Sequence, residues 1–282
     1  MPQLTTNDGR RLAWREVGSG PLLVCHPGGP GFSSRCLGDL AELARQRTLI
    51  LLDPRGTGDS DRPADPSAYD LDDYADDLEA LRRELARERL DLLGHSHGGF
   101  VAMRWAGTHP EHVGRLVLAS TTPRFTDAIR DARRGRVASH AGQPYFEDAM
   151  QALRAHQEGR YANDTELTAL YAREWPVFVP LGFDAGPAFE ALLQAGTNAD
   201  ALRHFNEHVA PTMDHRSLLQ AIRSPTLLIF GELDPFTSAA GEMADALPDA
   251  TLIVLQGADH FVFLEDEHRA DWSRAVLEFL DS

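Results

Sequence analysis

A serine flanked by glycines is the feature of this sequence that most directly suggests chemistry. Residues 94–99 read Gly-His-Ser-His-Gly-Gly, a G-x-S-x-G pattern centred on Ser96. An apolar run precedes the pattern and apolar residues at helical spacing follow it, which predicts a strand, a sharp turn and a helix. Gly94 and Gly98 leave room for neighbouring backbone, and the turn presents the Ser96 hydroxyl at a helix N-terminus. We interpret Ser96 as a candidate nucleophile; the alternative is an ordinary turn between a strand and a helix.

A serine hydroxyl needs a base, and the base needs an orienting carboxylate, before the oxygen attacks a carbonyl carbon. Asp234 and His260 each follow a predicted buried strand, at residues 226–230 and 251–255. Parallel strands bring their carboxyl ends to one edge of a sheet, so we expect both side chains near Ser96. The alternatives are a turn-forming aspartate before a proline and a polar loop histidine.

Acyl transfer also needs N–H donors for the negative oxygen of the tetrahedral intermediate. The backbone N–H of His97, directly after the candidate nucleophile, is one expected donor. The other is expected from the loop at residues 26–31, which reads His-Pro-Gly-Gly-Pro-Gly. We assign this role to the N–H of Gly29, with Gly28 as the rival; the alternative is a plain Gly-Pro turn.

The elements that must position these residues alternate between strands and helices. Strands are predicted at 4–17 (two short strands around an Asn-Asp-Gly turn), 21–25, 48–52, 90–93, 113–119, 226–230 and 251–255. Helices are predicted after Ser33 or Ser34, from an N-cap at Asp70, from the serine turn to about His109, at 239–246 and at 266–280. This alternation predicts an α/β fold with a doubly wound, mostly parallel sheet.

The stretch from 123 to 214 differs from the rest of the chain. It has no strong strand pattern and is rich in Arg, Asp, Glu and Ala with scattered aromatic residues. We therefore expect a helical cap at 123–214, inserted into a core formed by residues 1–122 and 215–282. An insertion after a strand of this kind lies at the sheet edge where ligands bind.

Composition excludes several classes of partner. The chain has 282 residues, 43% hydrophobic, enough for one large core with a subdomain. A net charge of −16 argues against nucleic acid and against an anionic membrane surface. Two cysteines make no disulfide framework, and neither a secretory signal nor an apolar run of about 18 residues is present, so we expect a cytoplasmic protein. We expect no metal and no cofactor, since zinc spacing and a phosphate loop are both missing.

Together these motifs resemble α/β-hydrolase-fold serine hydrolases across nearly the whole chain. The loop Gly28-Gly29-Pro30-Gly31, with Asp-Pro-Arg-Gly-Thr-Gly-Asp-Ser at 53–60, is similar to the proline iminopeptidase branch (peptidase S33 type). The resemblance implies release of an N-terminal residue from small peptides, and a helical cap whose acidic groups hold the substrate amine. In this chain Pro27 separates His26 from the glycines, and the serine turn is closer to that of esterases and carbon–carbon-bond hydrolases.

The resemblance directs attention to a few cap residues. Glu174, Glu190 and Glu207 are candidate amine anchors, with solvated helix faces as the alternative. Trp175 and Phe178 are candidates for lining an apolar substrate pocket, with cap core as the alternative. The resulting hypothesis is a serine hydrolase of small peptides or small molecules. The alternatives are an esterase, lactonase or carbon–carbon hydrolase, and a ligand receptor or non-hydrolytic enzyme on the same fold.

Overall fold

The computed structural model describes residues 2–183 and 186–282, built around one eight-stranded sheet. The strand order is β1-β2-β4-β3-β5-β6-β7-β8, and only β1 and β2 run antiparallel to their neighbours. The strands are β1 (Gln3–Thr5), β2 (Arg11–Gly18), β3 (Leu22–His26), β4 (Thr48–Leu52), β5 (Leu90–His95), β6 (Val113–Ala119), β7 (Thr226–Gly231) and β8 (Ala250–Leu255). The predicted mostly parallel α/β sheet is confirmed.

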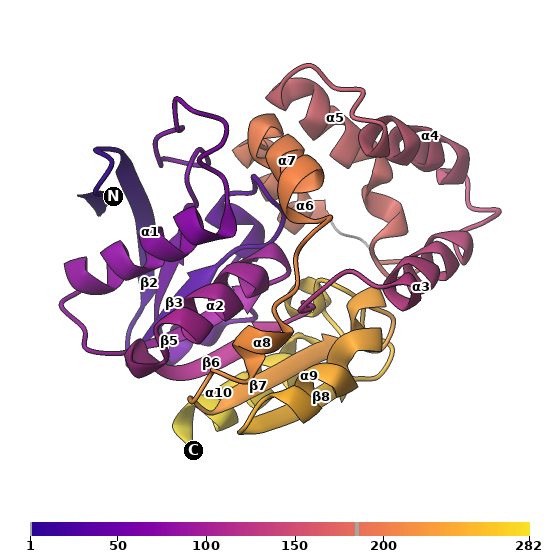
Figure 1. Cartoon of the computed structure of the whole chain (residues 1–282). Coiled ribbons are helices and arrows are strands. Elements are labelled where there is room, and N and C mark those ends of the chain that lie inside the picture. Colours follow the sequence, from indigo (N-terminus) through magenta and orange to yellow (C-terminus); the bar gives the residue numbers. More distant parts are fainter. Residues whose placement is uncertain (1, 184–185) are drawn as a thin grey trace.

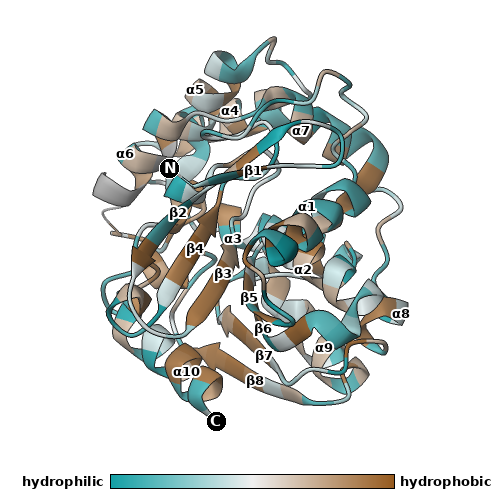
Figure 2. Cartoon of the chain, turned by 90° about the vertical axis from the view of Figure 1, so that its left-hand side faces the viewer, coloured by the Kyte–Doolittle hydropathy of each residue, from teal (hydrophilic) through white to brown (hydrophobic). Residues whose placement is uncertain are grey.

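Helices cover both faces of the sheet, because its central strands are apolar on both sides (Figures 1 and 2). Along β4, Ile50 and Leu52 belong to one core and Leu49 and Leu51 to the other. The first core is closed by α1 (Leu71–Glu84), α2 (His97–Thr108), α8 (Arg216–Leu219) and α9 (Ala240–Ala246). The second is closed mainly by α10 (Arg269–Asp281). Alternating side chains on buried parallel strands explain this two-sided packing.

The chain between β6 and β7 forms helices at one end of the sheet (Figure 1). They are α3 (Asp127–Ala138), α4 (Phe146–Gln157), α5 (Asp164–Glu174), α6 (Gly186–Ala195) and α7 (Ala199–His204). The two ends of this stretch adjoin: Arg124 and Asp214 form an isolated bridge, and the His215 N–H donates to the Pro123 carbonyl at 2.9 Å. This proximity supports our proposal that 123–214 is one inserted cap.

One predicted helix is wrong. After Ser33 the chain makes two 3₁₀ turns, Ser34–Leu37 and Leu43–Arg45, separated by residues with positive φ at Leu40, Ala41 and Glu42. Leu37, Leu40 and Leu43 are nonetheless fully buried. A spacing of three suits 3₁₀ turns as well as an α-helix, so the leucine pattern did not distinguish them.

The capping prediction for α1 is confirmed. The Asp70 side chain accepts a hydrogen bond from the backbone N–H of Asp73. In return, the Asp73 carboxylate accepts from the Asp70 N–H at 3.1 Å. This reciprocal pair satisfies two N–H groups at the helix start. In the described ranges 2–183 and 186–282, no helix has the length and apolar character needed to cross a bilayer.

Candidate active site

Ser96 occupies a strained turn between β5 and α2. Its φ is +53°, a left-handed backbone conformation that is rare for a residue with a side chain. A Cβ on Gly98 would lie 2.3 Å from the His26 carbonyl oxygen, and one on Gly94 would lie 2.4 Å from the Gly98 carbonyl oxygen. Both positions therefore require glycine, for the reason that the sequence suggested.

The structure brings Ser96, His260 and Asp234 together. His260 follows β8 and Asp234 follows β7, at the same edge of the sheet as Ser96. His260 Nε2 lies 3.1 Å from Ser96 Oγ, and His260 Nδ1 lies 3.1 Å from Asp234 Oδ1. The Asp234 side chain is fully buried, and its Oδ1 also accepts from the Phe236 N–H at 3.0 Å. The three groups are thus linked in the order hydroxyl, imidazole, carboxylate.

Asp234 and His260 each stabilise the charged form of the other. Burial would raise the pKa of Asp234, but the charge of His260 and its hydrogen bond outweigh burial and lower it. Burial would likewise lower the pKa of His260, but Asp234 outweighs it and raises that pKa. The carboxylate therefore stabilises an imidazolium, which is the state that forms when an imidazole takes a proton from a serine hydroxyl.

His95 holds the backbone of His260 through a hydrogen bond. Its Nε2 donates to the His260 carbonyl oxygen at 3.0 Å, and the two ring centroids are 5.0 Å apart. Burial lowers the pKa of His95 to about 3, so this ring is neutral at physiological pH. The sequence offered no signal for this contact, because the partners are 165 residues apart.

The glycine-rich loop at 26–31 lies against the serine. A Cβ on Gly28 would be 3.0 Å from Ser96 Cβ, so nothing larger than glycine fits there. The next residue, Gly29, has a φ of +56°, and its carbonyl accepts from the Phe32 N–H at 3.0 Å. His97, the other expected N–H donor, is the first residue of α2.

Aromatic cap residues reach the loop that carries His260. Trp175 stacks on Phe189 at 4.6 Å and packs against Phe261 at 4.7 Å, the residue after His260. Trp175 also lines a pocket of about 550 Å³ with Tyr145, Val179, Phe183, Phe189 and Glu190. Phe178 is half-buried. Trp175 therefore combines the two roles that the sequence left open, because it is buried in the core and lines a pocket.

The three cap glutamates have different surroundings. Glu174 is completely buried, and its Oε1 lies 2.7 Å from His156 Nδ1. A solvated helix face is therefore the wrong interpretation for Glu174. Glu207 is exposed, 3.8 Å from His208, and Glu190 is exposed at the cap pocket. No hydrogen bond or ion pair in the described part of the chain joins any of these carboxylates to Ser96 or His260.

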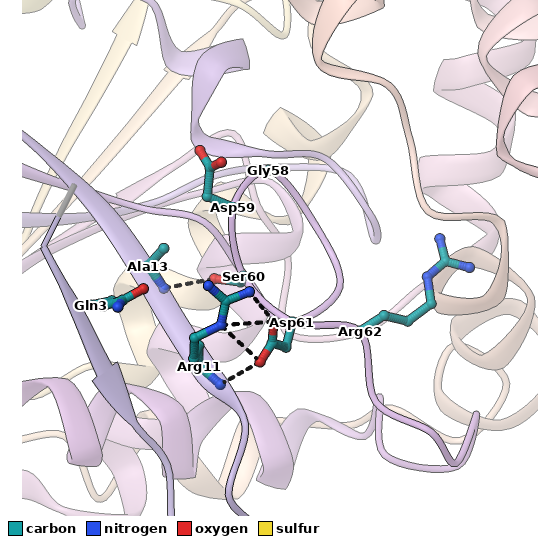
Figure 3. A pocket seen from close by; sticks show the side chains of 8 residues that line it. All are labelled: Gln3, Arg11, Ala13, Gly58, Asp59, Ser60, Asp61 and Arg62. Atoms are coloured by element: carbon teal, nitrogen blue, oxygen red, sulfur yellow. Dashed lines mark hydrogen bonds and ion pairs between the residues drawn. The ribbon is translucent and has the colours of Figure 1, made fainter.

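A second pocket, of about 470 Å³, has none of these residues in its lining, and Figure 3 shows the side chains that do line it. It is lined by β2 and by the loop that contains the 53–60 motif. There Arg11 pairs with Asp61 at 2.6 Å, and Ser60 Oγ accepts from the Ala13 N–H at 2.9 Å. Within the same motif, Arg55 is buried against Asp77 at 2.8 Å. The motif thus ties loops to the sheet.

Among the residues whose placement is described, no group of three or more His, Cys, Asp or Glu is placed to bind a metal ion. Burial raises the pKa of both cysteine thiols, that of Cys36 to about 12. Buried, protonated thiols of this kind act as small apolar side chains.

Comparisons with known proteins agree with this architecture. A family model described as alpha/beta hydrolase fold matches residues 21–267. A proline iminopeptidase of Lactobacillus helveticus is 41% identical over 279 residues, covering 93% of this chain and 90% of that protein. A 2-(acetamidomethylene)succinate hydrolase of Mesorhizobium japonicum is 32% identical over 270 residues, covering 95% and 91%. The crystal structure of a hydrolase from Pseudomonas aeruginosa matches with a TM-score of 0.70 and 28% identity, covering 100% and 98%. This chain therefore belongs to the α/β-hydrolase fold family of hydrolases.

Proposed function

We propose that the protein is a serine hydrolase in which Ser96, His260 and Asp234 form the catalytic triad. The observation that carries this proposal is the pair of 3.1 Å contacts that His260 makes, one to Ser96 Oγ and one to Asp234 Oδ1. Ser96 Oγ attacks the substrate carbonyl while His260 Nε2 takes its proton. His260 then gives the proton to the leaving group, and water releases the acyl group from Ser96 by the same steps.

The N–H groups of His97 and Gly29 hold the oxyanion in this proposal. His97 begins α2, so its N–H has no acceptor within the helix. Gly29, whose φ is +56°, is the second donor in this proposal, and Gly28 is the rival.

Release of an N-terminal residue, with proline as the first candidate, is the leading substrate hypothesis. The 41% identity to a proline iminopeptidase over nearly the whole chain supports it. Hydrolysis of small esters or amides without a free amine is the second candidate. Burial of Glu174 against His156 favours it, because this carboxylate is withdrawn from any substrate amine.

Hydrolysis rates on two matched substrate sets test both the proposed triad and the proposed substrate class. Prolyl and other aminoacyl arylamides are assayed with free and acetylated amines, beside short-chain aryl esters, and Ser96→Ala is the control. We expect Ser96→Ala to lower kcat by a factor on the order of 10⁶ and to lose labelling by a fluorophosphonate. Near-normal turnover by this variant would overturn the triad. Cleavage of esters alone would leave the triad and remove the iminopeptidase hypothesis. Product analysis in water separates hydrolysis from acyl transfer or a lyase reaction.

A further inference from the structure

Arg133 lies on α3, the cap helix whose Arg136 reaches the loop of the proposed base. Helix α3 packs against the 3₁₀ turn Pro235–Ala239, which directly follows Asp234. One turn along α3, Arg136 pairs with Asp259 at 2.6 Å, and Asp259 precedes His260. Residues three apart share a helix face, so Arg133 points toward the same group of loops.

Arg133 differs from the other arginines of its helix. Arg130 pairs with Asp127, Arg134 with Asp131, and Arg136 with Asp259. In the described ranges, no carboxylate lies within ion-pair distance of Arg133. The Glu174 carboxylate, whose charge only partly opposes the lowering of the Arg133 pKa by burial, is hydrogen-bonded to His156 instead.

Arg133 is exposed to solvent, and one aromatic ring of the cap packs against it. Desolvation by the protein groups around it lowers the pKa of the Arg133 guanidinium. The guanidinium carbon lies 5.2 Å above the Phe178 ring, a cation–π contact that leaves the edge of the guanidinium free. The pKa of His260 is lowered by burial and raised by Asp234, and it also carries a lowering contribution from the charge of Arg133.

An unpaired guanidinium packed on an aromatic ring is suited to one kind of ligand. Its N–H donors match the two oxygens of a carboxylate, and the ring restricts the side chain before the ligand arrives. An anion bound beside Arg133 offsets the desolvation that lowers its pKa. A neutral substrate offers neither effect.

We propose that Arg133 is a carboxylate-binding subsite, so that the enzyme selects substrates with a carboxylate a few atoms from the scissile carbonyl. This inference rests on the proposed triad, since it names the substrate class of the same site. The carboxylate belongs to either the acyl part or the leaving group. In a dipeptide, or in an amino acid acylated on its nitrogen, the carboxylate lies in the leaving group.

Matched aryl esters test this subsite. 4-Nitrophenyl hexanoate is the neutral reference, mono-4-nitrophenyl adipate carries a carboxylate on the acyl part, and 3-carboxy-4-nitrophenyl hexanoate carries one on the leaving group. We expect Arg133→Gln to lower kcat/KM for one carboxylate ester by about 10- to 100-fold, chiefly through KM, as loss of a charge-assisted hydrogen bond implies. The neutral ester should change by less than about threefold, and Arg133→Lys should be intermediate.

Arg134→Gln is the matched control. It removes an equal charge from the next residue of α3, where the arginine pairs with Asp131 on the surface. Equal losses for neutral and charged esters, or equal effects of Arg133→Gln and Arg134→Gln, would overturn the subsite, because both indicate a general effect of charge or folding.

A binding measurement separates failure of the subsite from failure of the proposed triad. If neither the esters nor the arylamides are cleaved in a Ser96-dependent manner, the proposed triad fails, but adipate binding still tests Arg133. Adipate should raise the Tm of Ser96→Ala, and the shift should disappear when Arg133→Gln is added. A shift that survives the added substitution, or no shift at all, would contradict the inference.

Discussion

His95 Nε2 donates a hydrogen bond to the His260 carbonyl oxygen at 3.0 Å, which ties the loop carrying the proposed base to the strand that ends at the proposed nucleophile. The His95 ring packs between Phe261 and Phe263, with centroids 5.1 and 4.9 Å away. The relative positions of His260 and Ser96 thus depend on the His95 side chain, which does not itself contact the serine hydroxyl.

His95→Phe should keep the ring packing and lose only the hydrogen bond. We expect kcat to fall by about tenfold with KM nearly unchanged, since one hydrogen bond of about 1.5 kcal/mol positions the base. Steady-state kinetics on an aryl ester measure both constants. An equal fall for His109→Phe, a histidine at the end of α2, would show that the effect is not specific to His95.

Asp234→Asn should lower kcat by roughly 10⁴, because an amide preserves the shape but stabilises neither the required tautomer nor the imidazolium. The pH dependence should change as well. Asp234 raises the pKa of His260 above its ordinary value of 6.5, so the acid limb of kcat/KM lies above that pH. In the variant the limb should move to lower pH. Asp245→Asn, an exposed position on α9, is the control, and an unshifted limb in Asp234→Asn would contradict the assigned pair.

Gly98→Ala should damage both activity and folding, because its Cβ would lie 2.3 Å from the His26 carbonyl oxygen and push away the loop that holds Gly29. We expect kcat to fall by at least about 10², the usual cost of one displaced oxyanion donor. Gly135→Ala in α3 is the comparison, since a Cβ there meets nothing within 4 Å. It should stabilise the protein by about 0.5–1 kcal/mol in urea unfolding and leave activity unchanged.

Glu265 should make the protein less stable as pH rises. Burial raises its pKa from 4.5 to about 7, so between these values the folded protein keeps a proton that the unfolded chain has released. The free energy of unfolding therefore falls across that window, by on the order of 3 kcal/mol from this group. In Glu265→Gln this pH-dependent loss of stability should be absent. The amide oxygen of the glutamine can still accept the Asp259 N–H, which lies 3.0 Å from Glu265 Oε1 in the structure.

Urea unfolding of both proteins at pH 5, 6, 7 and 8 measures this difference. Glu267→Gln, at an exposed position two residues along, should follow the wild-type curve. Parallel curves for wild type and Glu265→Gln would contradict a raised pKa at this site.

The sequence alone determined the sheet and the positions along the chain that could do chemistry. Strand patterns such as 48–52 and 113–119 agree with the structure to the residue, because fully apolar runs between turn residues are local signals. Ser96, Asp234 and His260 follow from those strands, since parallel strands end at one edge. Their catalytic roles remain predictions.

Only the tertiary structure decided which side chains are paired, buried or free. The sequence left Glu174 as an amine anchor or as part of a solvated helix face, but the structure buries it completely, with its Oε1 beside His156. Arg133 is one of several arginines in α3, and only the tertiary structure shows that, among the described residues, no carboxylate lies within ion-pair distance of it. Helical periodicity and turn chemistry act over a few residues, whereas burial and charge pairing depend on groups far apart in the chain. That physical difference separates what could be predicted here from what had to be observed.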